Sequence, residues 1–263
     1  MTRIAIVGVG LIGGSFALAL RKAGLDARFI GVSSPRTVER ALGLGAIDEA
    51  LPLEEATSRA DVIYLAQPIA RILQTLDMLD ARSALVTDAG STKCAIMARG
   101  RRHVRFVGGH PMAGKESRGV ESADADLFQG RPYVLTEPEP WLMKWIARIG
   151  ARPVIMSPED HDRLVAFTSH LPQLISTALA SSLGEEPQAA SVCGPGALDM
   201  TRLAASPYDI WRDIFATNAE SIDTALGAFI ARLERLRGQL RGAGLEADFD
   251  QAAAAAQRLR RGS

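Results

Sequence analysis

The amino-acid sequence predicts an α/β protein with an N-terminal Rossmann-type, doubly wound sheet followed by an all-helical C-terminal dimerisation domain. Three observations lead to this fold class. The first half alternates short β-rich runs with longer helical patterns, which is typical of βαβ units around a parallel sheet. A glycine-rich turn directly follows the first of these runs, and from Pro158 onward the sequence is helical almost throughout. We therefore predict two domains, residues 1–157 and 158–263.

The strands of the first domain are predicted from short runs rich in apolar and β-branched residues. The first run, Ile4 to Val7, is continuously apolar, as expected of a strand buried on both faces of a parallel sheet. The expected strands are residues 3–7, 28–32, 61–66, 84–88, 105–109 and 132–136, and a last strand-like run ends within 152–158. The helical patterns between them include residues 11–23, 35–43 and 68–79.

Apolar residues at spacings of three and four predict the helices of the second domain. Pro158, Glu159 and Asp160 form a helix start, with proline in the first turn and acidic side chains near the positive end of the helix dipole. The predicted helices are residues 158–183, 197–205, 207–237 and 244–261. Long helices cannot bury such apolar faces alone, so we expect a homodimer.

The composition is that of an ordinary globular protein and excludes several classes of partner. Hydrophobic residues make up 47% of the chain, and 30 Lys and Arg balance 30 Asp and Glu. A balanced charge gives no electrostatic reason to expect nucleic acid or an anionic membrane as a partner. We expect instead a small-molecule substrate that is held by local groups.

Cysteine usage and the absence of apolar spans indicate the compartment. Cys94 and Cys193 lie far apart and fit no metal-ligand spacing, so we expect free thiols and no metal site. No apolar stretch approaches the roughly 18 residues that span a bilayer, and a strand-like run begins at once without a basic leader. These features predict a cytoplasmic protein.

The segment Gly8-Val9-Gly10-Leu11-Ile12-Gly13 has the spacing of a dinucleotide-binding fingerprint. Gly8 permits the tight turn, Gly10 lets the backbone approach a pyrophosphate, and Gly13 allows close packing of helix on strand. The amides of Leu11 and Ile12 at the helix N-terminus then attract the phosphates. A strand before the motif and a helix after it strengthen the prediction of dinucleotide binding.

The end of the second strand bears on the choice of cofactor. An acid at this place holds the ribose hydroxyls of NAD, but the chain reads Gly31-Val32-Ser33-Ser34-Pro35-Arg36. Ser33, Ser34 and Arg36 suit a 2′-phosphate, because a guanidinium pairs with phosphate oxygens in a bidentate fork. We therefore expect NADP to be favoured over NAD, although Arg36 can also be a solvated residue of a helix start.

Hydride transfer from an alcohol needs a base near the hydroxyl group, and histidine is the default choice. His103 lies in a basic stretch and is expected to be exposed, and His161 at a helix start favours a capping or surface role. His110 directly follows a strand, at the carboxyl end of the sheet where open α/β folds bind ligands. His170 lies inside a helix and precedes Leu171-Pro172, so that the proline is expected to kink or open this helix.

Four further motifs give a specific resemblance. They are Thr87-Asp88-Ala89-Gly90-Ser91-Thr92-Lys93, Gly108-Gly109-His110-Pro111-Met112-Ala113-Gly114-Lys115-Glu116, Ser169-His170-Leu171-Pro172 and Asp199-Met200-Thr201-Arg202. Together with the glycine loop, and in this order, they resemble the prephenate and arogenate (cyclohexadienyl) dehydrogenase family. The resemblance runs from Gly8 to Trp211 and implies an NAD(P)-dependent oxidative decarboxylation of prephenate or arogenate in tyrosine biosynthesis.

The resemblance also implies roles for individual residues. His110 is expected to accept the hydroxyl proton, Ser91 to orient the hydroxyl group and Arg202 to hold a substrate carboxylate. The expected further substrate-binding residues are Glu116 at the mouth of the pocket, His170, Gly114, Trp211, Asp199 and Gly196, the last two at the site of a neighbouring subunit. Gln67 and Pro68 are expected beside the cofactor, although Gln67 departs from the small or hydroxyl residue expected before this proline.

Several alternatives stay open at this stage. Trp211 can equally pack in a core, Asp199 can cap a helix, Gly90-Ser91 can cap a strand-to-helix turn, and Arg202 can form a structural ion pair. The rival functions are another Rossmann-plus-helical dehydrogenase or reductase and a non-catalytic NADP-binding sensor. Prephenate and arogenate are not separated, because the neutral Gln129 favours prephenate whereas the expected NADP use favours arogenate.

Overall fold

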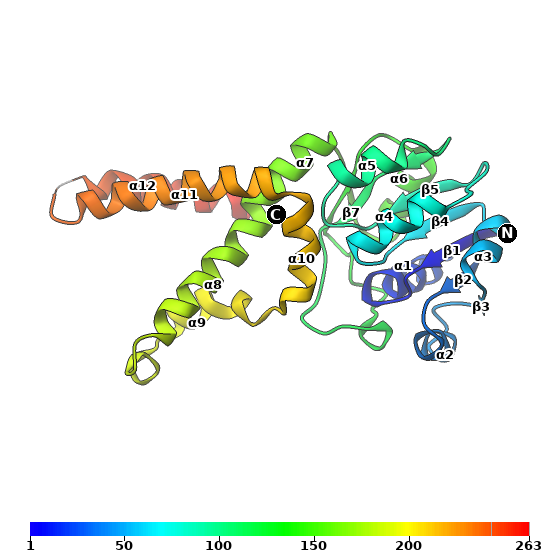
Figure 1. Ribbon diagram of the computed structural model, residues 1–263, viewed down its shortest axis with the longest axis horizontal. Coiled ribbons are helices and arrows are strands. Elements are labelled where there is room, and N and C mark those ends of the chain that lie inside the picture. Colours follow the sequence, from blue (N-terminus) through cyan, green and yellow to red (C-terminus); the bar gives the residue numbers. More distant parts are fainter. Residues whose placement is uncertain (243, 263) are drawn as a thin grey trace.

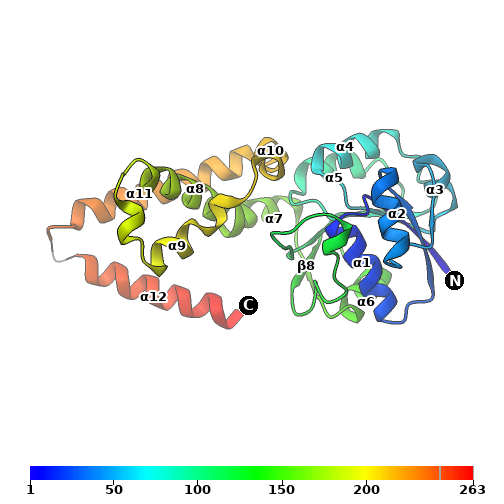
Figure 2. The same cartoon turned by 90° about the horizontal axis from the view of Figure 1, so that it is seen from below.

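The computed structural model describes residues 1–242 and 244–262 and has an elongated shape. Figure 1 shows the sheet-containing half at one end and the helical half projecting away from it as an arm. Figure 2, turned by 90°, shows the same separation, with α10 lying where the halves meet. The predicted boundary between residues 157 and 158 falls between the last strand, β9 (Arg152–Ile155), and α7 (Pro158–Val165).

The main sheet has six parallel strands in the order β3-β2-β1-β4-β5-β6. Its strands are β1 (Thr2–Val7), β2 (Ala27–Val32), β3 (Glu49–Ala50), β4 (Val62–Leu65), β5 (Leu85–Asp88) and β6 (Phe106–Val107). The order reverses direction at β1, so the carboxyl ends of β1 and β4 flank the position where doubly wound folds bind a ligand. The short edge strand β3 was not predicted.

The last strands of the first domain form a second, smaller sheet instead of extending the parallel one. The expected strand 105–109 is two strands, because β6 ends at Val107 and β7 (Gly109–Pro111) leaves the main sheet. β7 pairs antiparallel with β8 (Pro132–Leu135), which pairs parallel with β9. Gly108 lies at the change of sheet, where its amide donates to Thr136 Oγ1 at 2.9 Å. This second sheet places His110 opposite Val134.

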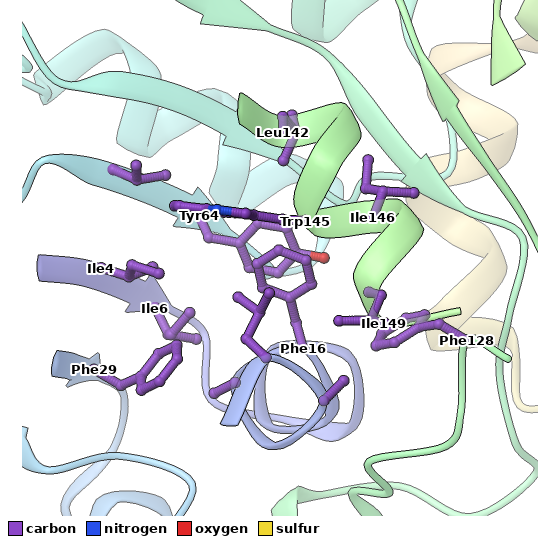
Figure 3. Close-up of a cluster of buried hydrophobic side chains, with 14 of the residues drawn as sticks. Ile4, Ile6, Phe16, Phe29, Tyr64, Phe128, Leu142, Trp145, Ile146 and Ile149 are labelled. Atoms are coloured by element: carbon purple, nitrogen blue, oxygen red, sulfur yellow. The ribbon is translucent and has the colours of Figure 1, made fainter. Parts of the chain in front are cut away.

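Helices cover both faces of the main sheet. They are α1 (Leu11–Lys22), α2 (Pro35–Gly43), α3 (Leu53–Arg59), α4 (Ile69–Met78), α5 (Cys94–Gly100) and α6 (Pro140–Arg148). On one face, Phe16 of α1 stacks on Tyr64 of β4 with ring centroids 4.1 Å apart. Figure 3 shows these rings beside Trp145 of α6. The other face is covered by α3, α4 and α5 and also contacts Ile214 from the helical half.

The helical half follows the prediction in type but not in continuity. The expected helix 158–183 is α7, a π-helical turn (Ala166–His170) and α8 (Leu171–Gly184). Pro172 has no amide to donate to the carbonyl of Thr168, which explains why the backbone widens here. The expected helix 197–205 is α9 (Pro195–Thr201) followed by a 3₁₀ turn (Arg202–Ala205).

The expected helix 207–237 is interrupted at Asn218. α10 (Tyr208–Thr217) ends there and α11 (Ala219–Gln239) begins, because Asn218 has φ −137° and ψ 26°. Its amide still bonds to the carbonyl of Ile214, and its carbonyl accepts from the amide of Ile222. The chain thus turns between two helices with its backbone groups satisfied. The last helix is α12 (Leu245–Gly262), which overlaps α11 in Figure 1 and diverges from it toward the C-terminus in Figure 2.

Candidate active site

A cleft of about 440 Å³ lies between the carboxyl edge of the main sheet and helix α10. It is lined from the sheet half by the loop after β1, the end of β4, the loop after β5 and the loop 113–119. Helix α10 contributes Asp209, Ile210, Asp213 and Ile214. The predicted site residues that line the cleft are Gly10, Leu11, Ile12, Gln67, Pro68, Ser91 and Gly114.

The glycine loop has the geometry that a dinucleotide phosphate needs. Gly8 has φ +96°, and a Cβ there would lie 2.6 Å from the carbonyl oxygen of Ala66. A Cβ on Gly13 would meet the carbonyl oxygen of Gly8 and lie 2.9 Å from Ile6 Cγ2, whereas a Cβ on Gly10 would meet nothing within 4 Å. The amides in the first turn of α1 have no partner within the helix. The loop therefore fits a pyrophosphate group of a bound dinucleotide.

The other predicted cofactor-binding residues differ in their contacts and in their distance from the cleft. Gln67 Oε1 accepts from Thr75 Oγ1 at 2.8 Å, which fixes the side chain at the edge of the cleft. Ser33, Ser34 and Arg36 are exposed at the start of α2 and are not among the described residues that line the cleft. Ser34 Oγ lies 2.9 Å from Thr37 Oγ1. These three residues are exposed at the end of β2, next to the cofactor fingerprint.

His110 is partly buried in β7 and is hydrogen-bonded to a second histidine. Its Nδ1 lies 2.8 Å from Nε2 of His161, which is fully buried at 0% exposure. His161 Nδ1 in turn lies 2.7 Å from Oδ1 of Asp162. The interpretation of His161 as a capping or surface residue is therefore wrong, because packing of α7 against α5 buries it behind His110. His103 is half-buried rather than exposed, with Nε2 3.1 Å from the carbonyl of Leu76.

A buried ion pair lies next to His110. Lys93 and Asp88 are both 0% exposed and form an ion pair, and Lys93 Nζ also donates to the carbonyl oxygen of Gly109 at 2.7 Å. Asp88 accepts from the amides of Gly90 and Gly109 at 2.7 and 3.0 Å. The pair thus connects the loop that carries Ser91 with the strand that carries His110. Both residues belong to a motif quoted from the sequence, but no role was assigned to them.

Burial and neighbouring positive charge determine the protonation of the histidines. Burial is the largest cause, with His161, Lys93 and His170 adding to it, and together they hold the pKa of His110 well below its ordinary value. Burial also lowers the pKa of His170 to about 4, partly opposed by the carboxylate of Asp162. Both side chains are therefore neutral at pH 7.

The predicted substrate-binding residues of the helical half lie in two groups. His170 is buried near Asn218, with His170 Nδ1 3.4 Å from Asn218 Nδ2, and its ring meets that of Trp211 edge to face at 6.2 Å. Trp211 Nε1 donates to Ser206 Oγ at 2.8 Å. Trp211 therefore packs beside His170 and against the core, so both readings of this residue remain compatible with its place.

Arg202, Glu116, Asp199 and Gly196 form the second, exposed group. Arg202 Nη1 lies 3.4 Å from Glu116 Oε1, and the two side chains are 62% and 86% exposed. Glu116 follows directly on Ala113 to Lys115, which line the cleft, so this pair stands at its mouth. Asp199 lies inside α9, whose N-cap is Gly194, so the capping role considered for Asp199 is wrong. Asp199 and Gly196 are exposed.

Two polar contacts that the sequence did not suggest join the halves across the cleft. Arg118 forms a two-bond ion pair with Asp209 at 2.9 and 3.0 Å. Asp213 Oδ2 accepts from the amide of Ala70 at 2.9 Å, in the first turn of α4. Gln129, by contrast, packs against Gly150 and is not among the described cleft residues, so it gives no argument about the substrate.

Other kinds of site find little support in the described residues. In residues 1–242 and 244–262, no group of three or more His, Cys, Asp and Glu is arranged to hold a metal ion. Cys94 and Cys193 are both free, and burial with the nearby Asp162 carboxylate raises the pKa of the Cys94 thiol to about 12. No helix in this part of the chain is long and apolar enough to cross a membrane.

Two family models match consecutive parts of the chain. Residues 16–151 match the nucleotide-binding domain of prephenate dehydrogenase, and residues 157–253 match its dimerization domain. A prephenate dehydrogenase from Lactococcus lactis subsp. cremoris is 33% identical over 235 residues, which cover 84% of this chain and 66% of the relative. The chain thus spans about two thirds of the length of that relative.

Solved structures extend the likeness to the whole chain. A prephenate dehydrogenase from Aquifex aeolicus, in complex with hydroxyphenyl propionate and NAD+, superposes with a TM-score of 0.87 and is 31% identical. The superposition covers 99% of this chain and 97% of that one. An arogenate dehydrogenase from Synechocystis has a TM-score of 0.81 and 30% identity, with 98% and 97% of the two chains covered.

Proposed function

Because this chain belongs to the prephenate dehydrogenase family, we propose that it oxidises and decarboxylates prephenate or arogenate with NAD(P)+ in tyrosine biosynthesis. The observation that carries the proposal is the arrangement around His110, which is not among the described residues that line the cleft but lies on a strand joined to the Ser91 loop of the cleft. This histidine is partly exposed, neutral at pH 7, and connected through the Lys93–Asp88 pair to the loop that carries Ser91. A neutral histidine with one free ring nitrogen suits proton acceptance from an alcohol.

The cofactor is proposed to bind along the cleft. Gly8, Gly10 and Gly13 shape the loop that holds the phosphates, and the amides of Leu11 and Ile12 face them. Gln67 and Pro68 border the cleft farther along. When bound, NAD(P)+ supplies the acceptor for a hydride. Ser33, Ser34 and Arg36 support a preference for NADP, since no carboxylate occupies the end of β2.

The chain's own residues then have separate tasks on the substrate. His110 accepts the hydroxyl proton while Ser91 hydrogen-bonds to the same hydroxyl group and orients it. The electron pair of the broken O–H bond forms the ring carbonyl as hydride departs. Loss of CO2 then leaves the electron pair of the broken C–C bond in the ring, which becomes aromatic, and the former carbonyl oxygen regains the proton from His110 as a phenol hydroxyl group. Arg202 binds a substrate carboxylate in a bidentate fork, with Glu116 and Gly114 at the mouth of the pocket. His170 and Trp211 are proposed to border the substrate from the helical half, and Gly196 and Asp199 to act at the subunit interface.

Family membership argues against the rival functions. A different Rossmann-plus-helical dehydrogenase would not be expected to carry the Gly108–Glu116 motif, and a sensor would not need His110 and Arg202 together. The similar proteins carry both names, so the proposal includes both prephenate and arogenate as substrates. We also propose a cytoplasmic location, which the two free cysteines support.

The proposal is tested by assaying the protein with four combinations of substrate and cofactor. Prephenate and arogenate, each with NADP+ and with NAD+, are assayed by formation of the reduced nicotinamide. His110→Asn keeps a polar group of similar size and should lower kcat by roughly 10²–10⁴ with KM modestly affected, because the base acts in the transition state. His103→Asn is the matched control. A His110→Asn protein with near wild-type kcat at saturating substrate would show that the proton goes elsewhere.

A further inference from the structure

His161 is a buried histidine that the mechanism above does not use. Both of its ring nitrogens are engaged, Nε2 with His110 at 2.8 Å and Nδ1 with Asp162 at 2.7 Å. Its ring meets that of His110 at 72° with centroids 5.1 Å apart. A fully buried side chain with a partner on each nitrogen has a fixed orientation, so it also fixes the residue that it contacts.

The protonation state of Asp162 sets the direction of the hydrogen bonds from Asp162 through His161 to His110. Asp162 Oδ1 accepts from the amide of Lys93 at 2.6 Å, and its Oδ2 accepts from the amide of Cys94 at 2.9 Å. Burial alone raises the pKa of Asp162, but the hydrogen bonds from His161 and from these amides lower it below its ordinary value. The group is therefore a carboxylate, which can only accept hydrogen bonds.

The tautomers of both histidines follow from this starting point. Since Asp162 only accepts, His161 carries its proton on Nδ1 and, when neutral, presents a lone pair at Nε2. His110 must then donate from Nδ1 to that lone pair. A neutral His110 with a proton on Nδ1 has its lone pair on Nε2, the nitrogen that His161 does not contact. This is the tautomer that can accept a proton from a substrate.

We propose that His161 is a positioning residue that holds His110 in the Nδ1–H tautomer and so directs its Nε2 lone pair at the substrate hydroxyl group. This inference rests on the proposed function, in which His110 is the base. As Nε2 takes the hydroxyl proton, the Nδ1–H bond to His161 becomes charge-assisted, and such bonds are roughly twice as strong as neutral ones. His161 thus stabilises the histidinium that forms during the reaction.

The other charged groups around His110 make this contribution necessary. Lys93 from the loop after β5 opposes a positive charge on His110, and the Asp88 carboxylate is paired with Lys93, whereas His170 from the helical half is neutral at pH 7. The Asp162 carboxylate reaches His110 only through His161. A charged His161 would hold the pKa of His110 down, whereas a neutral His161 that accepts from His110 Nδ1 favours the protonated form of His110.

The kinetic test compares two substitutions of His161 with a control. His161→Leu removes the acceptor and should lower kcat by roughly 10²–10⁴, the range that general acid–base catalysis contributes, with KM changed little. His161→Gln places an amide oxygen near the former Nε2 and should recover kcat to within about tenfold of wild type. His103→Leu, at a half-buried histidine away from the site, should leave kcat unchanged. Circular dichroism verifies that each protein is folded.

A spectroscopic test does not depend on turnover. Proton–nitrogen correlation NMR of the isotope-labelled full chain should show neutral His110 protonated on Nδ1 in wild type and in His161→Gln. In His161→Leu the Nε2–H tautomer should appear. Wild-type His110 protonated on Nε2 would overturn the inference, as would a folded His161→Leu protein with wild-type kcat.

The two variants also cover the case in which one of them fails to fold. If His161→Leu is unfolded, His161→Gln decides alone: wild-type tautomer and nearly wild-type kcat support positioning, and a loss of kcat equal to that of His110→Asn contradicts it. Failure of the proposed function has a different signature. The wild-type protein would then turn over neither prephenate nor arogenate, while the tautomer of His110 would still be measured.

Discussion

At the scale of single residues, His170 connects the site to the stability of the protein. It is 1% exposed, and burial lowers its pKa from 6.5 to about 4. In the unfolded chain the histidine recovers its ordinary pKa, so between pH 6.5 and about 4 the unfolded state binds more protons than the folded state. Stability is therefore fully present above pH 6.5 and is lost as the pH falls through this interval.

The acid sensitivity of His170 can be measured by urea unfolding. Lowering the pH from 7 to about 4.5 should reduce the free energy of unfolding, with His170 contributing up to roughly 3 kcal/mol of the loss. In His170→Asn the loss over the same interval should be smaller by about that amount, because asparagine does not titrate. Equal losses in the two proteins would show that His170 is not the responsible group.

The exposure of Arg202 and its ion pair with Glu116 limit how much its substitution should raise KM. Its guanidinium is 62% exposed and already paired with Glu116, so substrate would replace one partner by another rather than fill a buried site. We expect Arg202→Gln to raise KM about 10- to 100-fold with kcat changed little, as loss of one charge-assisted contact of roughly 1.5–3 kcal/mol implies.

The control for Arg202 is Arg212→Gln, an exposed arginine on α10 that stacks on Tyr208. It should leave KM unchanged. A normal KM in Arg202→Gln would leave the arginine with only its structural ion pair to Glu116, which is the alternative that the sequence left open.

Some residues around the site could be predicted from the sequence and others could not. His110 was expected directly after a strand, whereas it lies within β7, beyond the end of β6 at Val107. Its place in this part of the chain could be predicted from local order, but the change of sheet could not. His161 could not, because its burial depends on α7 docking against α5, which no local pattern encodes. The motif around Asp88 and Lys93 was recognised, but the pairing of the two inside the protein was not.

At the scale of elements, the start of α2 decides the expected choice of cofactor. Arg36 lies in its first turn, next to Ser34 at the N-cap, and its side chain is exposed. Arg36→Ala should lower kcat/KM for NADP+ by about tenfold or more and change that for NAD+ little, because only NADP carries the 2′-phosphate. Arg28→Ala is the control, since Arg28 lies at the opposite end of β2 and pairs with Glu49. Equal effects of Arg36→Ala on both cofactors would contradict the prediction.

The periodicity of apolar residues predicted the helices and strands themselves, but not the positions at which they are interrupted. The helices around Pro172 and Asn218 were expected as continuous segments, since apolar spacing persists across both positions. Missing amide donation at Pro172 and the backbone angles of Asn218 interrupt them. Similarly, the run 105–109 has uniform strand character, and only the pairing of β7 with β8 shows that it belongs to two sheets.

At the scale of the whole molecule, the helices α11 and α12 at the outer part of the helical arm predict a homodimer. Its exposed apolar side chains include Ile230, Leu233, Leu240, Phe249 and Leu259. A single arm cannot bury them, and residues 157–253 match a domain described as a dimerization domain. Light scattering at micromolar concentration should therefore report about twice the chain mass of 28.1 kDa.

Substitution on this arm tests the same prediction. Ile230 and Leu233 lie one turn apart on α11 and are 47% and 48% exposed. The double variant Ile230→Glu/Leu233→Glu should yield monomers, because burying two carboxylates in an apolar interface is costly. Met78→Glu, at a 72% exposed position on α4, should remain dimeric. A fully active wild-type monomer would remove both the dimer and any role of Asp199 across an interface.

The contact of Asp162 with the amides of Lys93 and Cys94 bears on how such chains can be recombined. Those amides belong to the N-cap and the first residue of α5 in the nucleotide-binding half, while Asp162 lies on α7 of the helical half. The start of a helix in one half therefore depends on a carboxylate from the other half, and such a cap is worth about 1 kcal/mol. Recombining either half with a distant homologue requires that this carboxylate and the turn before α5 be exchanged together. The two halves are distinct in architecture, but this contact makes them a matched pair.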